Sequence, residues 1–146
     1  MSDLLQHDAA DLADDARRLL AELDRDVVGA ELASAECRPP IDVIETSSTV
    51  DVIVDVPGVP SGALRVVIRR NTVLVVGIKM PPAGDSTVRF HLAERSYGRF
   101  ARVVRLIGAI DASRARATVT GGRLRVVLPR LEERRGRVYA VPVERG

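Results

Sequence analysis

The sequence predicts an all-β protein: an antiparallel β-sandwich, preceded by an amphipathic helix and followed by a flexible C-terminal tail. Three observations support this prediction. From Ile41 onward, seven or eight short runs alternate apolar and polar residues with a period of two, as half-buried strands do. Turn-forming residues separate these runs and no long helical pattern interrupts them, which is typical of a sandwich. Before Ile41, apolar residues instead recur every three or four positions, which indicates a helix.

The amphipathic helix is expected over residues 3–36, and Pro39-Pro40 must end it because proline cannot continue a helix. Its apolar stripe contains no aromatic residue. Two interpretations stay open: the stripe packs against the domain or another helix, or it is a contact surface for unfolded proteins. Both hold if the helix docks reversibly. The stripe consists of Leu12, Ala16, Leu19, Leu20, Leu23 and Val27.

The strand-like runs follow one another closely. Pro57-Gly58 marks the first turn, and Arg70-Asn71 marks a hairpin in which Asn71 tolerates the left-handed conformation. Residues 80–87 form a loop by composition. The expected strands are 41–45, 50–56, 64–68, 72–78, a short one at 88–92, 99–106, 115–119 and 123–128.

The last hairpin turns at Gly121-Gly122, where the backbone must adopt a positive φ. Pro129 ends its second strand because proline cannot donate to a ladder. Aromatic residues make up only 3% of the chain and tryptophan is absent, so the core is expected to consist of Val, Leu, Ile and Ala. The alternation places three apolar residues on one face of that strand, namely Leu124, Val126 and Leu128.

Composition narrows the compartment and the partners. The single Cys37 excludes an internal disulfide and a multi-cysteine metal site, which fits a reducing compartment. No run approaches the roughly 18 apolar residues of a membrane span. The acidic N-terminus does not resemble a secretory signal. We therefore expect a cytoplasmic protein with no membrane partner.

Charge is distributed unevenly. Residues 1–40 carry ten acidic and four basic residues, and residues 41–146 carry ten acidic and eighteen basic residues. Nucleic-acid binding by the basic part is one hypothesis. However, the arginines alternate along predicted strands, as in Arg123/Arg125, with no interleaved aromatic residues on which bases could stack. No nucleic-acid partner is expected.

No catalytic grouping emerges from the titratable residues. His7 and His91 lie far apart in the sequence, and the strand carboxylates Glu45, Asp42, Asp51 and Asp55 occupy positions expected to face solvent. No loop carries closely spaced metal ligands. The sequence therefore predicts a protein that is not an enzyme and that uses no cofactor or metal.

Several segments, in this order, resemble those of the small heat-shock proteins, the α-crystallin family of ATP-independent chaperones. They are PPIDVIET (39–46), VDVPGV (54–59), ERSYGRFAR (94–102), Ala117 with Gly122 and Leu124, a basic residue after Pro129, and Val141-Pro142-Val143. The resemblance implies an immunoglobulin-like α-crystallin domain over residues 39–130. A helical arm at 1–38 would precede it and an extension at 131–146 would follow it.

The resemblance also implies that the chain dimerises and assembles into larger oligomers. The excursion at 79–97 has the length seen in members that add a strand to the partner's sheet, which would use Val88, Phe90 and Leu92. At or near the dimer contact would lie Tyr97, Gly98, Phe100 and Arg102, with Glu94 or Arg95 paired across it.

The tail motif is expected to join dimers. Val141 and Val143 would enter an apolar groove between sheet edges of another dimer, and Pro142 would lower the ordering cost by pre-extending the segment. One wall of this groove is assigned to the strand carrying Leu124, Val126 and Leu128.

The resulting functional hypothesis is a holdase that binds unfolding proteins and prevents their aggregation. Clients would contact the helix stripe at Leu12, Leu19, Leu20, Leu23 and Val27, and the other partner is the chain itself. The alternative, motivated by the aromatic-free helix, is an assembly or adaptor module of the same fold with weak chaperone activity.

Overall fold

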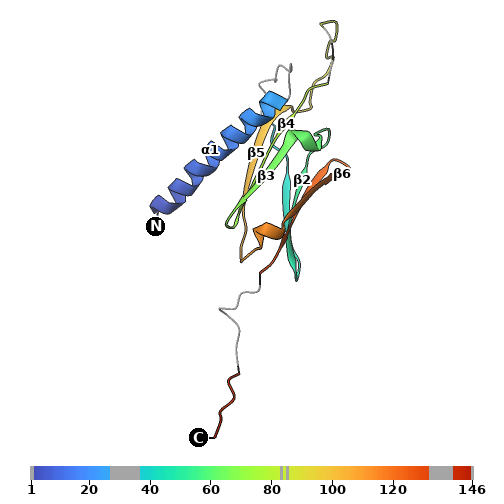
Figure 1. Cartoon of the computed structure of the whole chain (residues 1–146). Coiled ribbons are helices and arrows are strands. Elements are labelled where there is room, and N and C mark those ends of the chain that lie inside the picture. Colours follow the sequence, from blue (N-terminus) through green and yellow to red (C-terminus); the bar gives the residue numbers. More distant parts are fainter. Residues whose placement is uncertain (1, 27–36, 83, 85, 132–139, 146) are drawn as a thin grey trace.

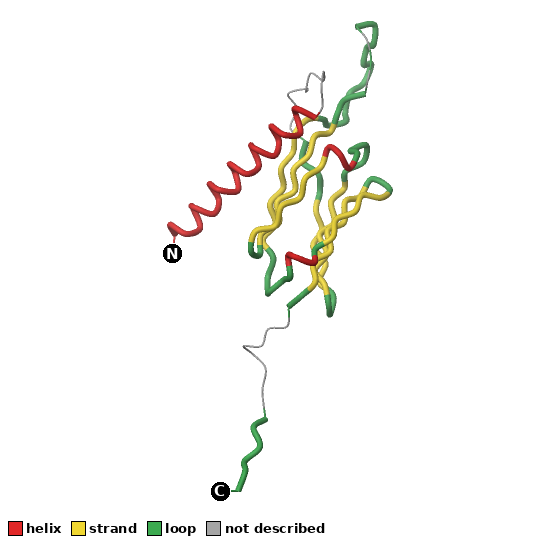
Figure 2. The backbone as a smooth tube through the Cα atoms, in the orientation of Figure 1, coloured by secondary structure: helices red, strands yellow, loops and turns green. Residues whose placement is uncertain are grey.

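The computed structural model describes residues 2–26, 37–82, 84, 86–131 and 140–145 of the chain. Two antiparallel sheets face each other, and helix α1 (Ser2–Asp26) lies along the outer side of one of them (Figure 1). The C-terminal residues extend away from the sandwich as an irregular segment (Figure 2). The prediction of an antiparallel sandwich with an N-terminal helix is confirmed.

The sheets have four and three strands, in the orders β1-β2-β7-β6 and β3-β4-β5. Strands β1, β6, β3 and β5 are therefore sheet edges. The bounds are β1 Ile41–Glu45, β2 Thr49–Asp55, β3 Leu64–Arg69, β4 Thr72–Lys79, β5 Gly98–Arg105, β6 Arg116–Thr120 and β7 Arg123–Pro129, with short 3-10 turns at Ser61–Ala63 and Ala112–Arg114.

The main core fills the space between the sheets. Alternate residues of each strand point inward, so Val52 and Val126 from one sheet meet Val73 and Val75 from the other. The core also contains Phe100, which corrects the expectation of a purely aliphatic interior. Room for this ring comes from Gly77, its cross-strand neighbour, where an added Cβ would lie 2.3 Å from the Phe100 Cζ.

Strand β4 is buried on both faces. Its inward residues Val73 and Val75 belong to the core between the sheets, whereas Leu74, Val76 and Ile78 point outward, beneath α1. The three-stranded sheet is therefore covered on both sides, which is uncommon for an antiparallel sheet of this size.

The turns follow the sequence with one exception. Gly121 and Gly122 have φ of 59° and 76°, as a type I′ hairpin requires. In the β3–β4 hairpin the positive φ, 53°, falls on Arg70 rather than on Asn71, so the assignment to Asn71 is wrong. A positive φ at the first loop residue alone is the pattern of a type II′ turn.

Most predicted strands are present with small shifts at their ends, but the short strand at 88–92 is not: these residues pair with no strand of the described chain. Pro129 is the last residue of β7, as predicted, and pairs with Thr49. The helix is described to Asp26, so the predicted continuation over 27–36 lies outside the described residues.

The close approach of Phe100 to Gly77 makes a stability prediction. Gly77→Ala places a methyl group inside the Phe100 ring and should lower the free energy of unfolding by about 1–3 kcal/mol, because a packed core does not accept extra volume. Urea unfolding measures this loss. Gly62→Ala is the matched control: its added Cβ meets no atom within 4 Å, and its stability should change little. Equal effects at both positions would contradict the packing argument.

Candidate functional site

The helix stripe is docked on the sheet and does not face solvent. Leu23 is fully buried, Leu12 is almost so, and Leu19 and Leu20 are half-buried. They pack against the outer face of the three-stranded sheet, together with Ala16 of the helix. The sheet residues of this second apolar cluster are Val67, Leu74, Val76, Ile78 and Met80. Of the predicted client-binding set, Val27 lies outside the described residues.

Ion pairs hold both halves of the docked helix. Near the middle of α1, Arg69 Nη2 of β3 lies 2.8 Å from Asp15 Oδ2, and Arg69 also approaches Asp11. Toward the end of α1, Arg99 of β5 pairs with Asp24. Both arginines point from the outer face of the sheet. The ion pairs and the apolar contacts therefore hold α1 against the same face. No local pattern predicts these ion pairs, because each joins α1 to a strand far away in the sequence.

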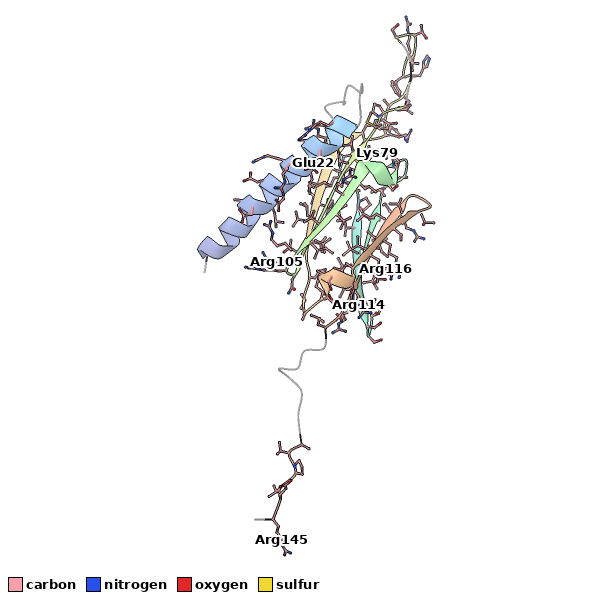
Figure 3. The ribbon with its side chains drawn as sticks, in the orientation of Figure 1. Glu22, Lys79, Arg105, Arg114, Arg116 and Arg145 are labelled. Carbon is pink, nitrogen blue, oxygen red and sulfur yellow. The ribbon has the colours of Figure 1, made fainter. Side chains whose placement is uncertain are left out.

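An apolar groove remains open beside the helix. Its volume is about 510 Å³, and it lies between α1 and the outer face of β5. Val103 of β5 is 52% exposed there, and Arg105, labelled in Figure 3, closes one end. Because β5 is a sheet edge, the groove lies next to backbone groups that have no strand partner among the described residues. The lining residues are Leu12, Ala13, Ala16, Thr72, Ala101, Val103 and Arg105.

The predicted dimer-contact residues divide into two groups. Gly98 and Phe100 are buried inside this chain's own sandwich, and that they lie near a dimer contact stays a prediction. The cause of their burial is the strand alternation, which turns both residues inward. Arg102 donates a hydrogen bond to the Pro39 carbonyl at 3.0 Å.

Tyr97 forms a small cationic–aromatic cluster at the base of the excursion. The Arg95 guanidinium carbon lies 5.2 Å from the centre of its ring, and the Lys79 ammonium lies 6.0 Å away. Glu94 is exposed beside this cluster. Whether Glu94, Arg95 and Tyr97 meet a partner stays a prediction.

The excursion presents an alternating apolar surface. Val88, Phe90 and Leu92 are all more than half exposed, at 55%, 61% and 75%. The edge strand β1 offers a similar surface, with Val43 and Ile44 close to half exposed. Segments with this combination can add to one another as strands.

The tail residues make no contact with the described domain. Val141 is 81% exposed and Val143 is 97% exposed. The groove wall assigned to Leu124, Val126 and Leu128 is wrong, because all three are buried in the core and β7 lies between β2 and β6. Apolar residues that are only partly buried lie instead near the edges β3 and β6: Val66, Ile68, Ala115 and Val119.

One carboxylate expected at the surface is buried. Asp51 on β2 is only 3% exposed, and its Oδ2 accepts hydrogen bonds from Arg125 Nε, at 3.1 Å, and from Arg125 Nη2. Its Oδ1 has no partner among the described atoms. Asp51 does face outward, as the alternation predicted, but Arg125 of β7 and the neighbouring strands cover it.

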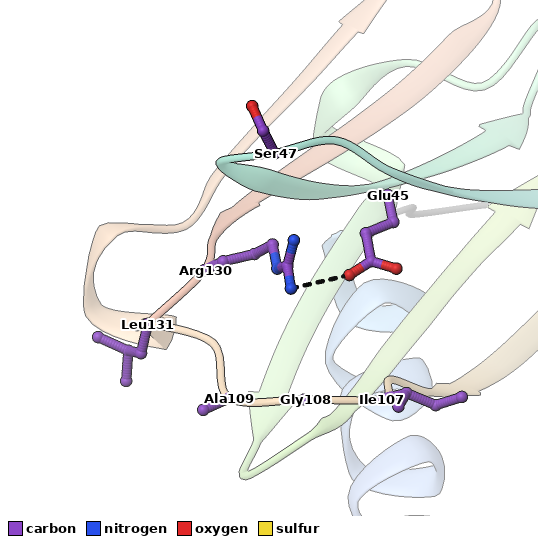
Figure 4. A pocket seen from close by; sticks show the side chains of 7 residues that line it. All are labelled: Glu45, Ser47, Ile107, Gly108, Ala109, Arg130 and Leu131. Carbon is purple, nitrogen blue, oxygen red and sulfur yellow. Dashed lines mark ion pairs between the residues drawn. The ribbon is translucent and has the colours of Figure 1, made fainter. Parts of the chain in front are cut away.

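Another ion pair, between Arg130 and Glu45, lies in a polar pocket of about 410 Å³ at one end of the sandwich (Figure 4). Arg130 Nη2 lies 3.0 Å from Glu45 Oε1, and Arg130 Nη1 donates to the Thr46 carbonyl. These bonds fasten the β1–β2 turn to the end of β7. Ile107, at the rim, is almost fully exposed.

Two other kinds of site are absent from the residues that the structure describes. Among them, no three His, Cys, Asp or Glu side chains lie close enough together to hold a metal ion. Within the same residues, no helix has the length and apolar character needed to cross a membrane.

Comparison with known proteins identifies the family. Residues 42–144 match the model of the "Hsp20/alpha crystallin family". The chain is 33% identical over 142 residues to a 21.9 kDa heat shock protein from rice (Oryza sativa subsp. japonica), covering 86% of this chain and 69% of that protein. It is 32% identical over 98 residues to an 18 kDa heat shock protein from Streptomyces albus G, covering 67% and 68% of the two chains.

Solved structures agree. Heat shock protein 16.0 from Schizosaccharomyces pombe superposes with a TM-score of 0.64 at 29% identity, covering 73% of this chain and all of that chain. HspA from Xanthomonas axonopodis gives 0.60 at 26% identity, covering 66% and 96%. The fold is thus that of an α-crystallin domain. The chain belongs to the Hsp20/alpha crystallin family of small heat-shock proteins, which are ATP-independent chaperones and not enzymes.

The Asp51–Arg125 pair predicts an asymmetry between its two partners. Arg125→Ala leaves a buried, unpaired carboxylate and should cost about 2–4 kcal/mol of unfolding free energy. Asp51→Val removes the buried charge and should change stability by less than about 1 kcal/mol. Urea unfolding of both variants and of the double variant measures the difference. A double variant no more stable than Arg125→Ala would show that the stranded carboxylate is not the cause.

Proposed function

We propose that this protein is a holdase that binds unfolding proteins without ATP, and that it works as an oligomer built from dimers. The observation that carries the proposal is the apolar surface that Leu74, Val76 and Ile78 form on the outer face of β4, covered by a helix that has no aromatic anchor. Unfolding proteins present apolar side chains of the same kind, so a client segment can replace the helix on this face. The single cysteine favours the reducing cytoplasm as the place of action.

The energetics suit a reversible cover. Each buried Leu of the stripe contributes roughly 1.5–3 kcal/mol, and each ion pair, whose arginine is about half exposed, contributes about 1 kcal/mol. The cost of holding the helix in one position offsets part of this sum. A helix bound by a few leucines and two arginines therefore leaves the sheet far more readily than a core strand does.

The dimer is proposed to form by strand addition. The exposed segment 88–92 of one chain would pair with the edge strand β1 of its partner, where Val43 and Ile44 are exposed. A segment of five residues is too short to be stable alone and gains a hydrogen-bonded ladder from the partner's edge. Dimers would then associate through Val141 and Val143.

The tail is proposed to bind near the β3 and β6 edges of another dimer. Val66, Ile68 and Val119 offer partly buried apolar surface there. Burying two valines contributes at most roughly 3–5 kcal/mol before the cost of ordering the tail. Such a contact exchanges readily.

Weakening the helix dock should increase chaperone activity. Arg69→Glu with Arg99→Glu removes the ion pairs to Asp15 and Asp24, and should raise the undocked population by about fivefold. The amount of this double variant needed to halve the thermal aggregation of a client such as citrate synthase or malate dehydrogenase should then be smaller than the amount of unaltered protein. Arg70→Glu, at an exposed arginine with no recorded partner among the described residues, is the matched control.

The same assay separates the two functional hypotheses. If the unaltered protein at equimolar ratio gave no protection to any of several clients, the holdase proposal would fail. Protection by Arg69→Glu/Arg99→Glu no better than by the control would overturn the role of the helix as a cover. If the protein is an adaptor, changes in the helix would alter its binding to one particular partner. They would not alter a general protection of clients.

Replacing the tail valines should change the mass of the oligomer. Val141→Ser with Val143→Ser should dissociate the assembly toward dimers, since both exposed apolar side chains are lost. Pro142→Ala keeps both valines and should weaken assembly only slightly, by about 0.4–1 kcal/mol, because it affects only the freedom of the unbound tail. Light scattering measures the mass of each variant. Unchanged mass in the double serine variant would contradict the assembly role.

A further inference from the structure

A hollow of about 420 Å³ lies at the end of the four-stranded sheet, where β6 begins and β7 ends. Its charged part is made by Arg114 and Arg116, and its apolar part by Ala115, Val127 and Pro129. Figure 3 labels both arginines, on the part of the sandwich away from α1. Both are exposed, and neither is paired with any residue that the structure describes.

No acidic side chain lines this hollow among the described residues. The nearest acid along the chain is Asp111, but its Oδ1 already accepts hydrogen bonds from the Ser113 amide, at 3.1 Å, and from the Ser113 hydroxyl. The hollow is therefore a cationic site with an apolar wall and no acid of its own.

The tail carries the complementary sequence. Glu144 directly follows Val143, and both are exposed on a segment that makes no recorded contact with the described domain. Other acids fit less well: Glu45 is paired with Arg130, and Glu22 lies on α1 between Arg18 and Arg25. An apolar residue followed by a carboxylate matches a hollow with an apolar wall beside two arginines.

We propose that Arg114 and Arg116 bind the carboxylate of Glu144 from the tail of a second copy, while Val143 lies against the apolar wall of the hollow. This inference rests on the proposed assembly role of the tail and adds the polar contact that orients it. Ala115 both lines the hollow and packs against the core near the proposed valine site. Arg116, Val127 and Pro129 lie on the outer face of the four-stranded sheet, so the ion pair would place Val143 on that face at the beginning of β6, while Val141 would lie along the β6 edge.

The length of the tail permits this contact. Arg130 and Leu131 are still bound to the domain, because their amides donate to the Ser48 and Ala109 carbonyls. Residues 132–140 therefore separate the domain from Val141, and fully extended they reach roughly 30 Å. Pro129 lines the hollow just before the tail begins, so docking within one chain would require the tail to turn back on itself.

Charge reversal tests the contact in the full-length protein. Glu144→Arg alone and Arg114→Glu/Arg116→Glu alone each bring like charges together. Each should raise the concentration at which the assembly half-dissociates by about fivefold, measured by light scattering. The triple variant should assemble normally. The matched controls are Arg145→Glu in the tail and Arg123→Glu at the other end of β7, neither of which should have this effect.

Mixing the two single-site variants identifies the chain that supplies the tail. When Glu144→Arg protein is mixed with Arg114→Glu/Arg116→Glu protein, every contact between unlike chains joins opposite charges, so large assemblies should return. Recovery by the triple variant without recovery on mixing would mean that the tail binds its own chain, and would overturn the proposal. If neither the triple variant nor mixing restores the assembly, Glu144 makes its contact at another site. That outcome would also overturn the proposal.

The valine variants distinguish failure of this inference from failure of the proposed function. If Val141→Ser/Val143→Ser dissociates the assembly while Glu144→Arg does not, the tail joins dimers but the two arginines do not orient it. If the valine variant has no effect, the assembly role itself fails.

Discussion

Strand β4 is apolar on both of its faces, and burying both requires a layer on each side of the three-stranded sheet. The four-stranded sheet supplies one layer through Val52, Val54 and Val126. Helix α1 supplies the other, through Leu12 and Leu23 against Leu74 and Ile78. The two layers differ in permanence: the first is the interior of the sandwich, crossed by core side chains, whereas the second is a tethered helix assisted by Arg69 and Arg99. Without α1 the sheet would present a continuous apolar strip to solvent, the kind of surface that other chains bind.

The chemistry of the rest of the surface is consistent with binding rather than catalysis. Sheet edges β1, β3, β5 and β6 are open in the single chain, and apolar side chains lie beside them in the excursion, the α1–β5 groove and the tail. An isolated edge is a site where another strand adds. At the beginning of β6, for example, Arg114 and Arg116 would favour a segment that carries a carboxylate. Family membership and these open edges point in the same direction, toward a molecule whose activity lies in association.

Much of the fold was predictable because alternation and turn chemistry are local. The glycine hairpin, the strand periods and the motif order each placed an element correctly. The errors came from neighbours that one strand cannot reveal. Asp51 was assigned to solvent from its alternation, yet Arg125, 74 positions away, covers it. Leu124 and Leu128 were correctly turned to one face, but that face is the closed interior and not a groove. A better signal existed for the helix dock: the unbroken run TVLVVGI in β4 indicates a strand buried on both sides. The proposed contacts of the excursion and the tail involve a second chain, so no pattern within one chain fixes them.

The attachment of α1 to the same polypeptide has a quantitative consequence for selectivity. A segment joined to its binding site by a short linker competes at an effective concentration in the millimolar range, however dilute the protein is. In the proposed mechanism a client would therefore have to outbind a resident ligand that is always present. Proteins that expose one brief apolar stretch do not meet this requirement, whereas a chain that has lost its core and offers many such stretches does. The apparent affinity for any client also scales with the fraction of molecules whose helix is undocked. In the proposed mechanism such a tethered competitor sets a threshold, so that only clients offering enough apolar surface to outbind α1 would occupy the strip on β4.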